Sequence, residues 1–195
     1  MKKIREPSTG ASGYAVYVRS GSDLTAHGIL LSGLIYIGEA KRTERRGPLQ
    51  DQYSGSCSLR RTIGALLKEE LDLRAVPSGS GRTKRDFMNY CFTFDDEMKL
   101  TDWIEQNLEI RPLPLGDNRG GTRSNRAGKR DAIRTMQPVL CLTGWRNPYA
   151  SRLRALRRTC ADEAHAANGE PPRPLASSAN ASTPNASAAS RGRRR

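Results

Sequence analysis

Long apolar runs are missing from this 195-residue sequence, and histidine is scarce. A membrane-spanning helix needs about 20 consecutive apolar residues, and no such run occurs. The opening MKKIREPSTG is basic but has no apolar segment behind it, so we expect no signal peptide. With two histidines and four scattered cysteines, none in a CxxC pair, the sequence argues against a zinc site. Unpaired thiols are typical of a reducing compartment, and we expect the cytoplasm.

Negative charge is also in short supply. The sequence has 20 Asp and Glu residues and 33 Lys and Arg residues, which gives a net charge of +13 and a pI near 10.2. Neutralising phosphates releases condensed counterions, so this excess favours a nucleic acid as partner. Association with RNA or ribosomes, or solubility alone, would account for the same surplus.

The composition divides the chain into three parts. Residues 1–12 are polar and predict a flexible arm, and residues 13–167 hold nearly all the apolar patterning. Residues 168–195 are rich in Pro, Ser, Ala and Asn and end in RGRRR. Such a segment buries too little apolar surface to offset the entropy of ordering, so we predict a disordered basic tail.

Two short runs near the start predict a hairpin of strands. The first, GYAVYV, begins at Gly13, and the second, LIYI, ends before Gly38. Both are rich in β-branched and aromatic residues, which favour strands. A third strand is expected around residues 90–94, where aromatic residues alternate with Cys91 and Thr93.

Apolar residues at helical spacing predict the helices. The clearest pattern starts near Leu59 and reaches Leu71; further helices are expected over about 95–108, 129–137 and 150–167. Residues 111–128 are rich in Gly and Arg and predict a mobile loop. The sequence therefore predicts an α/β fold: a small central, mainly antiparallel sheet of about three strands, starting with a hairpin and flanked by helices.

Four motifs occur in order along this domain: YIG at 36–38, SLRRTIGALL at 58–67, LTDWIEQNL at 100–108 and TGWRNP at 143–148. Together they resemble one bacterial branch of the GIY-YIG nuclease family, over about residues 13–165. The YIG motif is intact. The first motif is degenerate, because Ala15-Val16-Tyr17 keeps the tyrosine and loses the glycine.

The resemblance implies a metal-dependent endonuclease that acts on DNA phosphodiesters. It assigns catalytic roles to Tyr17 and Tyr36, which would assist attack on the phosphate, and we expect their side chains to converge on one pocket. Arg46 lies ten residues after Tyr36, where the family has an arginine that neutralises charge on the phosphate oxygens. A glutamate on a later helix holds one Mg²⁺ (or Mn²⁺) in the family.

The family's pattern places Arg130 where that glutamate should be. Arginine repels a divalent cation, so the metal ligand is unknown. Asp131 would serve only if the register is shifted, since it points about 100° around the helix. Cys141 and Gln52 also replace an asparagine and a histidine common in the family, and Glu39 and Asp51 are further carboxylates near the hairpin.

A basic, glycine-containing surface would grip the flanking backbone. Its candidate residues are Gly38, Lys41, Arg60, Arg61 and Arg130. Arg60 and Arg61 would bind phosphate or merely solvate their helix, and the arginine-rich face of the helix at 150–167 leaves the same choice open.

Two functions remain open from the sequence: a DNA endonuclease, or a catalytically weakened relative that binds nucleic acid without cutting it. A carboxylate (Asp131 or Glu39) within reach of Tyr36 and Arg46 would favour the enzyme. An arginine in its place would favour the binder. RNA or ribosome association is a third reading of the basic surface.

Overall fold

The computed structural model describes residues 13–19, 24–31, 33–39, 53–115 and 121–167. The expected arm (1–12) and tail (168–195) lie outside these residues, as do Arg46, Lys41, Asp51 and Gln52. None of the helices in the described part is long and apolar enough to cross a membrane.

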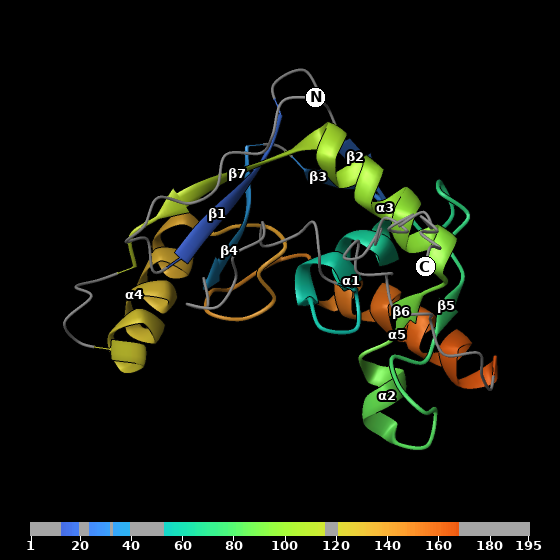
Figure 1. Ribbon diagram of the computed structural model, residues 1–195. Coiled ribbons are helices and arrows are strands. Elements are labelled where there is room, and N and C mark those ends of the chain that lie inside the picture. The colour runs from blue at the N-terminus through green and yellow to red at the C-terminus, as the bar shows by residue number, and fades with distance from the viewer. Residues whose placement is uncertain (1–12, 20–23, 32, 40–52, 116–120, 168–195) are drawn as a thin grey trace, which may run out of the picture.

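A three-stranded antiparallel sheet forms the centre of the fold, in the order β4-β1-β7 (Figure 1). Its strands are β1 (Gly13–Val18), β4 (Leu34–Glu39) and β7 (Leu108–Leu113). The expected pairing of the first two is confirmed, with Val16 opposite Tyr36 and Tyr14 opposite Gly38. A small ribbon of β2 (Leu24–Ala26) and β3 (Ile29–Leu31) connects them in the chain. The predicted fold class is therefore confirmed.

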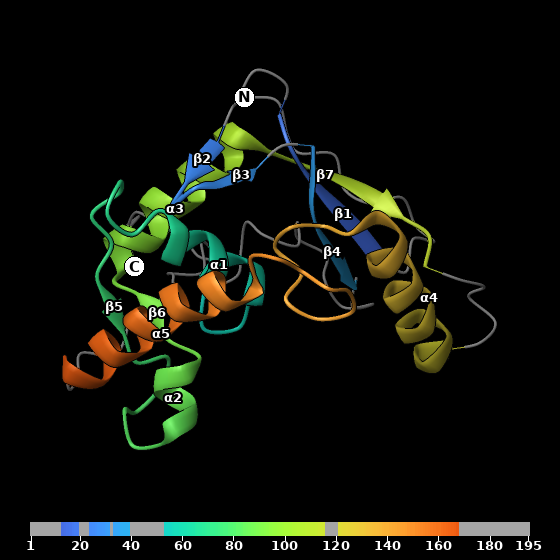
Figure 2. The same cartoon turned by 180° about the vertical axis from the view of Figure 1, so that it is seen from behind.

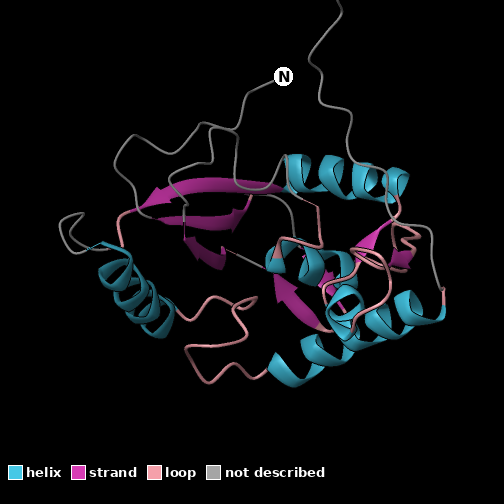
Figure 3. Ribbon diagram, turned by 60° about the horizontal axis from the view of Figure 1, so that its bottom comes forward, coloured by secondary structure: helices cyan, strands magenta, loops and turns pink. Residues whose placement is uncertain are grey.

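Helices lie on both sides of this sheet in the view of Figure 3. α4 (Gly121–Met136) packs beside β4, while α1 (Ser58–Leu66), α3 (Phe94–Asn107) and α5 (Ala150–Ala166) group at the other end. A second two-stranded ribbon, β5 (Ala75–Val76) with β6 (Cys91–Phe92), and the short α2 (Lys84–Met88) complete that end.

Three sequence expectations about these elements were wrong. The third strand of the central sheet is β7 and not the 90–94 segment, whose residues Cys91–Phe92 pair with β5 instead. Residues from Gly121 onward belong to α4, although 111–128 was expected to be a loop. The first long helix ends at Leu66, whereas the apolar pattern was expected to continue to Leu71. The backbone N–H of Leu67 donates the last hydrogen bond of this helix, to the carbonyl oxygen of Ile63.

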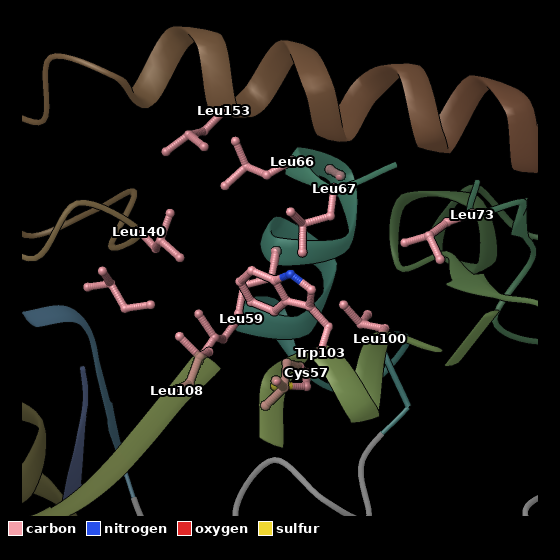
Figure 4. Packing of buried hydrophobic residues seen from close by; sticks show 14 of the residues in the cluster. Cys57, Leu59, Leu66, Leu67, Leu73, Leu100, Trp103, Leu108, Leu140 and Leu153 are labelled. Atoms are coloured by element: carbon pink, nitrogen blue, oxygen red, sulfur yellow. The ribbon is translucent and has the colours of Figure 1, made fainter. Parts of the chain in front are cut away.

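The main core lies between the sheet and the helices α1, α3 and α5 (Figure 4). Leu59 and Leu66 of α1 are almost fully buried, as is Leu153 of α5 above them. Trp103 and Leu100 of α3 close the core from the other side. A smaller cluster (Ile37, Leu115, Ile133, Cys141) joins β4 to α4. Tyr36 of β4 packs against both clusters.

Candidate nucleic-acid interface

Tyr36 and Tyr14 lie on the same face of the central sheet. Their ring centroids are 6.3 Å apart, and the planes are inclined by 37°. The ring of Tyr14 covers Gly38, the residue opposite it on β4. A Cβ atom at Gly38 would lie 2.1 Å from Cζ of Tyr14. The glycine of the YIG motif is therefore required for the Tyr14 ring to lie against the strand.

Tyr17 does not join them, which corrects the expectation that Tyr17 and Tyr36 converge. β1 pairs regularly with β7, so Tyr17 points to the sheet face opposite that of Tyr14 and Val16. There the Arg111 guanidinium lies 4.5 Å from the ring centroid of Tyr17. Side chains alternate between the two faces along a strand, and Tyr17 is three positions from Tyr14, so the two rings lie on opposite faces.

Tyr36 is half-buried at the junction of the two core clusters. Burial raises the pKa of its phenol, and the thiols of Cys141 and Cys57 add to that rise. Arg61 and Arg157 act in the opposite direction but do not cancel it. Tyr36 is therefore a neutral phenol at physiological pH, able to donate a hydrogen bond.

A cleft of about 780 Å³ opens beside Tyr36, and we call it the arginine cleft. Figure 2 shows α4 and α5 on either side of the loop that joins them, with β4 behind that loop. Four basic side chains line the cleft, and no acidic residue appears among the described lining residues. The lining comes from β4, α4, the 140–143 segment, α5 and single residues of α1 and α2: Tyr36, Ile37, Ser58, Met88, Lys129, Ile133, Leu140, Cys141, Leu142, Thr143, Ser151, Arg154, Ala155, Arg157 and Arg158.

A smaller cleft of about 560 Å³ lies against the end of β4. Glu39 lines it together with Arg126, Lys129 and Arg130 of α4. These three basic residues lie at helical spacing on one face of α4 with Ile133, which is buried against β4. Every charged side chain that α4 presents to the two clefts is thus basic among the described residues.

Asp131 points away from both clefts. Its side chain is 63 % exposed and pairs with Arg134 on the outer face of α4. In the part of the chain that the structure describes, no group of three His, Cys, Asp or Glu side chains could hold a metal ion. Glu39 is the one described carboxylate lining either cleft, and three basic residues line the same cleft. The described residues therefore do not fit a divalent metal.

Arg60 and Arg61 are not surface residues, which corrects their expected role in binding nucleic acid. Arg60 is only 1 % exposed, and its guanidinium lies 2.7 Å from the Glu97 carboxylate. The same carboxylate accepts hydrogen bonds from Ser54 and from the backbone N–H of Phe92. Arg61 donates to the carbonyl oxygens of Ser54 and Gly55. Neither of the open readings, phosphate binding or solvation, places these arginines in the interior, where their partners are protein groups.

Sequence reasoning did not include Tyr14, Lys129 or the three cleft arginines of α5 among the site residues. The alternation of side chains along a strand could have indicated Tyr14. It lies two positions from Val16, the residue opposite Tyr36, so all three side chains are on one face of the sheet. The arginines of α5 were noted as a basic face. The packing of α5 on α1, β5 and α2 places Arg154, Arg157 and Arg158 in the lining of the cleft that Tyr36 also lines.

Comparison with known proteins identifies the family of this chain. The family model described as GIY-YIG catalytic domain matches residues 26–158, well over half of the chain. No curated protein and no solved structure gives a significant match. The matched region includes β4 with its YIG motif, all of α4 and the cleft-lining part of α5. On this match, the chain belongs to the GIY-YIG catalytic domain family.

Proposed function

We propose that this protein binds the phosphodiester backbone of DNA beside Tyr36 and has little Mg²⁺-dependent cleavage activity. Membership in the GIY-YIG family supports a nuclease-like function with nucleic acid as the substrate class. The observation that carries the narrower proposal is the basic face of α4 (Arg126, Lys129, Arg130), whose Lys129 lines the same cleft as Tyr36.

The side chains of the site are suited to holding a phosphate. The neutral hydroxyl of Tyr36 would donate to a phosphate oxygen, and Lys129 would add a positive charge from α4. We further propose that Arg46 and Lys41, which follow β4 in the chain, contact the same backbone. Gly38 contributes indirectly, because it leaves room for the Tyr14 ring.

Cleavage in this family generally depends on a divalent metal, which activates the nucleophile when bound. Such an ion needs a well-placed carboxylate to remain bound. Arg130 borders the cleft at the end of β4, whereas Asp131 faces away and is paired with Arg134. This arrangement supports a site that retains a phosphate and excludes the metal.

One observation favours hydrolysis as a second candidate function. Glu39 lines the same cleft as Arg130 and lies three residues after Tyr36. If Glu39 supplied the missing carboxylate, the protein would be a metal-dependent endonuclease.

As its compartment we propose the cytoplasm, since all four cysteines are free and buried in the described structure.

The test compares DNA binding and plasmid nicking, with Mg²⁺ and with Mn²⁺, for wild type, Arg130→Glu and the control Arg134→Glu. Arg134 lies on the outer face of the same helix, so its substitution changes net charge equally without altering the cleft. We expect wild type to bind in the ordinary non-specific range, roughly 10⁻⁴–10⁻⁶ M, with affinity falling as salt rises. Only Arg130→Glu should gain nicking.

Four other results would each overturn the proposal in part or as a whole. If wild type nicks DNA briskly and Glu39→Gln abolishes the nicking, the protein is an endonuclease. If Asp131→Ala abolishes it instead, Asp131 is the ligand and α4 has the shifted register. Tighter binding of RNA than of DNA at the same salt concentration would move the assignment to RNA. Failure to bind either nucleic acid would refute the proposed function.

A further inference from the structure

The four basic side chains of the arginine cleft form no ion pair with any described carboxylate. Arg154 donates to the carbonyl oxygen of Leu142 at 2.9 Å, and Arg157 to the Ser58 hydroxyl at 3.5 Å. Both acceptors are neutral. In the described part of the chain no carboxylate pairs with Arg154, Arg157, Arg158 or Lys129. Four cations on one concave surface, with no acidic residue among its described lining residues, favour a polyanionic occupant.

The order of charges along α5 points the same way. A helix is stabilised by acidic residues near its N-terminus and basic ones near its C-terminus. α5 has the reverse order: its first turn has no acidic residue, its N-terminal half carries four arginines, and Asp162 and Glu163 lie near the end. Arg157 also lowers the pKa of Arg61, although burial of Arg61 is the larger cause. Helix stability alone does not explain this arrangement, but an anionic partner does.

The cleft is not lined by charge alone. Ile133, Leu140 and Cys141 are buried apolar residues in its lining, and Met88 of α2 lines the same cleft with a side chain that is 48 % exposed. A free phosphate would gain nothing from these apolar residues. A nucleobase would, because its faces are apolar and stack on apolar and aromatic side chains.

The size and shape of the cleft favour an unpaired strand over a duplex as its ligand. A volume of about 780 Å³ lies in the range of pockets that enclose small molecules, so a nucleotide fits and a duplex does not. In a duplex the base faces are covered by their neighbours, and only the backbone would touch the rim. Arg154 and Arg158 are one helical turn apart, about 6 Å along the axis, so they can contact successive phosphates of one strand.

We propose that the arginine cleft binds an unpaired DNA strand, with its phosphates on Arg154, Arg157 and Arg158 and a base against the apolar lining residues, Met88 among them. This inference rests on the proposed function and narrows it. The strand would enter the site along α5 and reach Tyr36 as single-stranded DNA.

The test measures fluorescence anisotropy of the full-length protein with a short labelled single strand and with the blunt duplex of the same sequence. Wild type should bind the single strand more tightly. Arg154→Gln/Arg157→Gln should weaken single-strand binding by about tenfold and reduce the salt slope by about 0.7 for each phosphate that is no longer neutralised. Arg158→Gln alone should have a smaller effect in the same direction. The control is Arg152→Gln, on the same helix but outside the cleft lining, with less than about a twofold change.

A second pair of variants tests the apolar lining residues. Met88→Ser should weaken single-strand binding by about threefold and leave duplex binding unchanged. Met98→Ser is the matched control, because Met98 is 45 % exposed and does not line the cleft. Equal effects of the two methionine variants, or equal affinity of wild type for strand and duplex, would overturn the unpaired-strand assignment. If the arginine variants behave like Arg152→Gln, the cleft is not the binding site. Absence of DNA binding by wild type would instead refute the proposed function itself.

Discussion

The contact between Tyr14 and Gly38 gives a structural reason for one residue of the YIG motif. The Tyr14 ring occupies the position where any side chain at Gly38 would begin. That same ring borders Tyr36 on the face that leads to the arginine cleft. A single glycine thus permits two tyrosines to share one face of the sheet.

Gly38→Ala should lower the free energy of unfolding by about 1–3 kcal/mol, the usual cost of overpacking. The new Cβ would meet the Tyr14 ring, which is itself buried between strand and core. Urea unfolding measures the decrease. In a Tyr14→Leu background the same substitution should cost less, as a double-mutant cycle would reveal. Additive effects would show that the two residues do not interact.

The buried pair of Arg60 and Glu97 predicts a larger loss of stability. Glu97→Ala should cost about 3–5 kcal/mol, because it leaves the Arg60 charge buried without its carboxylate. The matched control is Glu109→Ala, which breaks an exposed pair with Arg111 and should cost less than about 1 kcal/mol. Chemical denaturation compares the two variants. Similar losses would mean that the buried pair contributes no more than a surface pair.

At the scale of elements, β7 is the clearest case of structure that the sequence did not indicate. Leu108 continues the apolar stripe of α3, so the helix was expected to include it. Pro112 and the polar residues around it were typical of a loop. β7 is an edge strand, where a proline is tolerated, and its pairing with β1 makes it a strand.

The packing of α1 on β6 depends on Gly64. A Cβ at this position would lie 2.2 Å from Cε2 of Phe92, whose ring is completely buried. Alanine gains about 1 kcal/mol in helix propensity over glycine. We expect the clash to outweigh that gain, so Gly64→Ala should lower the thermal unfolding midpoint. A midpoint that rises would show that Phe92 moves aside without cost.

At the scale of the whole molecule, the buried thiols and phenols predict how stability depends on pH. Burial raises the pKa of Cys160 from 9.0 to about 11 and that of Cys91 to about 12. Between pH 9 and 11 the unfolded chain therefore loses protons that the folded protein keeps. Stability should be unaffected by these groups below pH 9 and should fall above it, by about 1.4 kcal/mol per pH unit for each such thiol.

Urea unfolding between pH 8 and 11 measures this slope, with Cys160→Ala as the variant that should reduce it. Tyr90 and Tyr36, whose pKa values burial also raises, add to the decline above pH 10. A free energy of unfolding that stays constant up to pH 11 would contradict the burial of these groups.

The C-terminal segment remains a prediction, since residues 168–195 lie outside the described structure. Its deletion should leave the thermal midpoint nearly unchanged, because its composition offers little apolar surface to a core. DNA binding should weaken, since the closing RGRRR contributes four positive charges. Calorimetry and anisotropy test both parts. Loss of cooperative unfolding would mean that the segment belongs to the fold.

The sequence by itself was enough to predict the family, the α/β class, the hairpin around YIG and the amphipathic helices. These follow from local periodicity and from motifs that are contiguous in the chain. It did not reveal that Arg60 and Arg61 are buried or that Tyr14 rather than Tyr17 lies beside Tyr36.

Those outcomes depend on contacts between residues far apart in sequence. Glu97 is 37 positions from Arg60, and only packing of α3 against α1 turns a surface-like arginine into a buried ion pair. The register of β1 against β4 and β7 decides which tyrosine faces the core. The arginines of α5 meet β4 and α4 only in the folded chain. Local pattern therefore determined which elements form, and tertiary packing decided which of their charges and rings share a site.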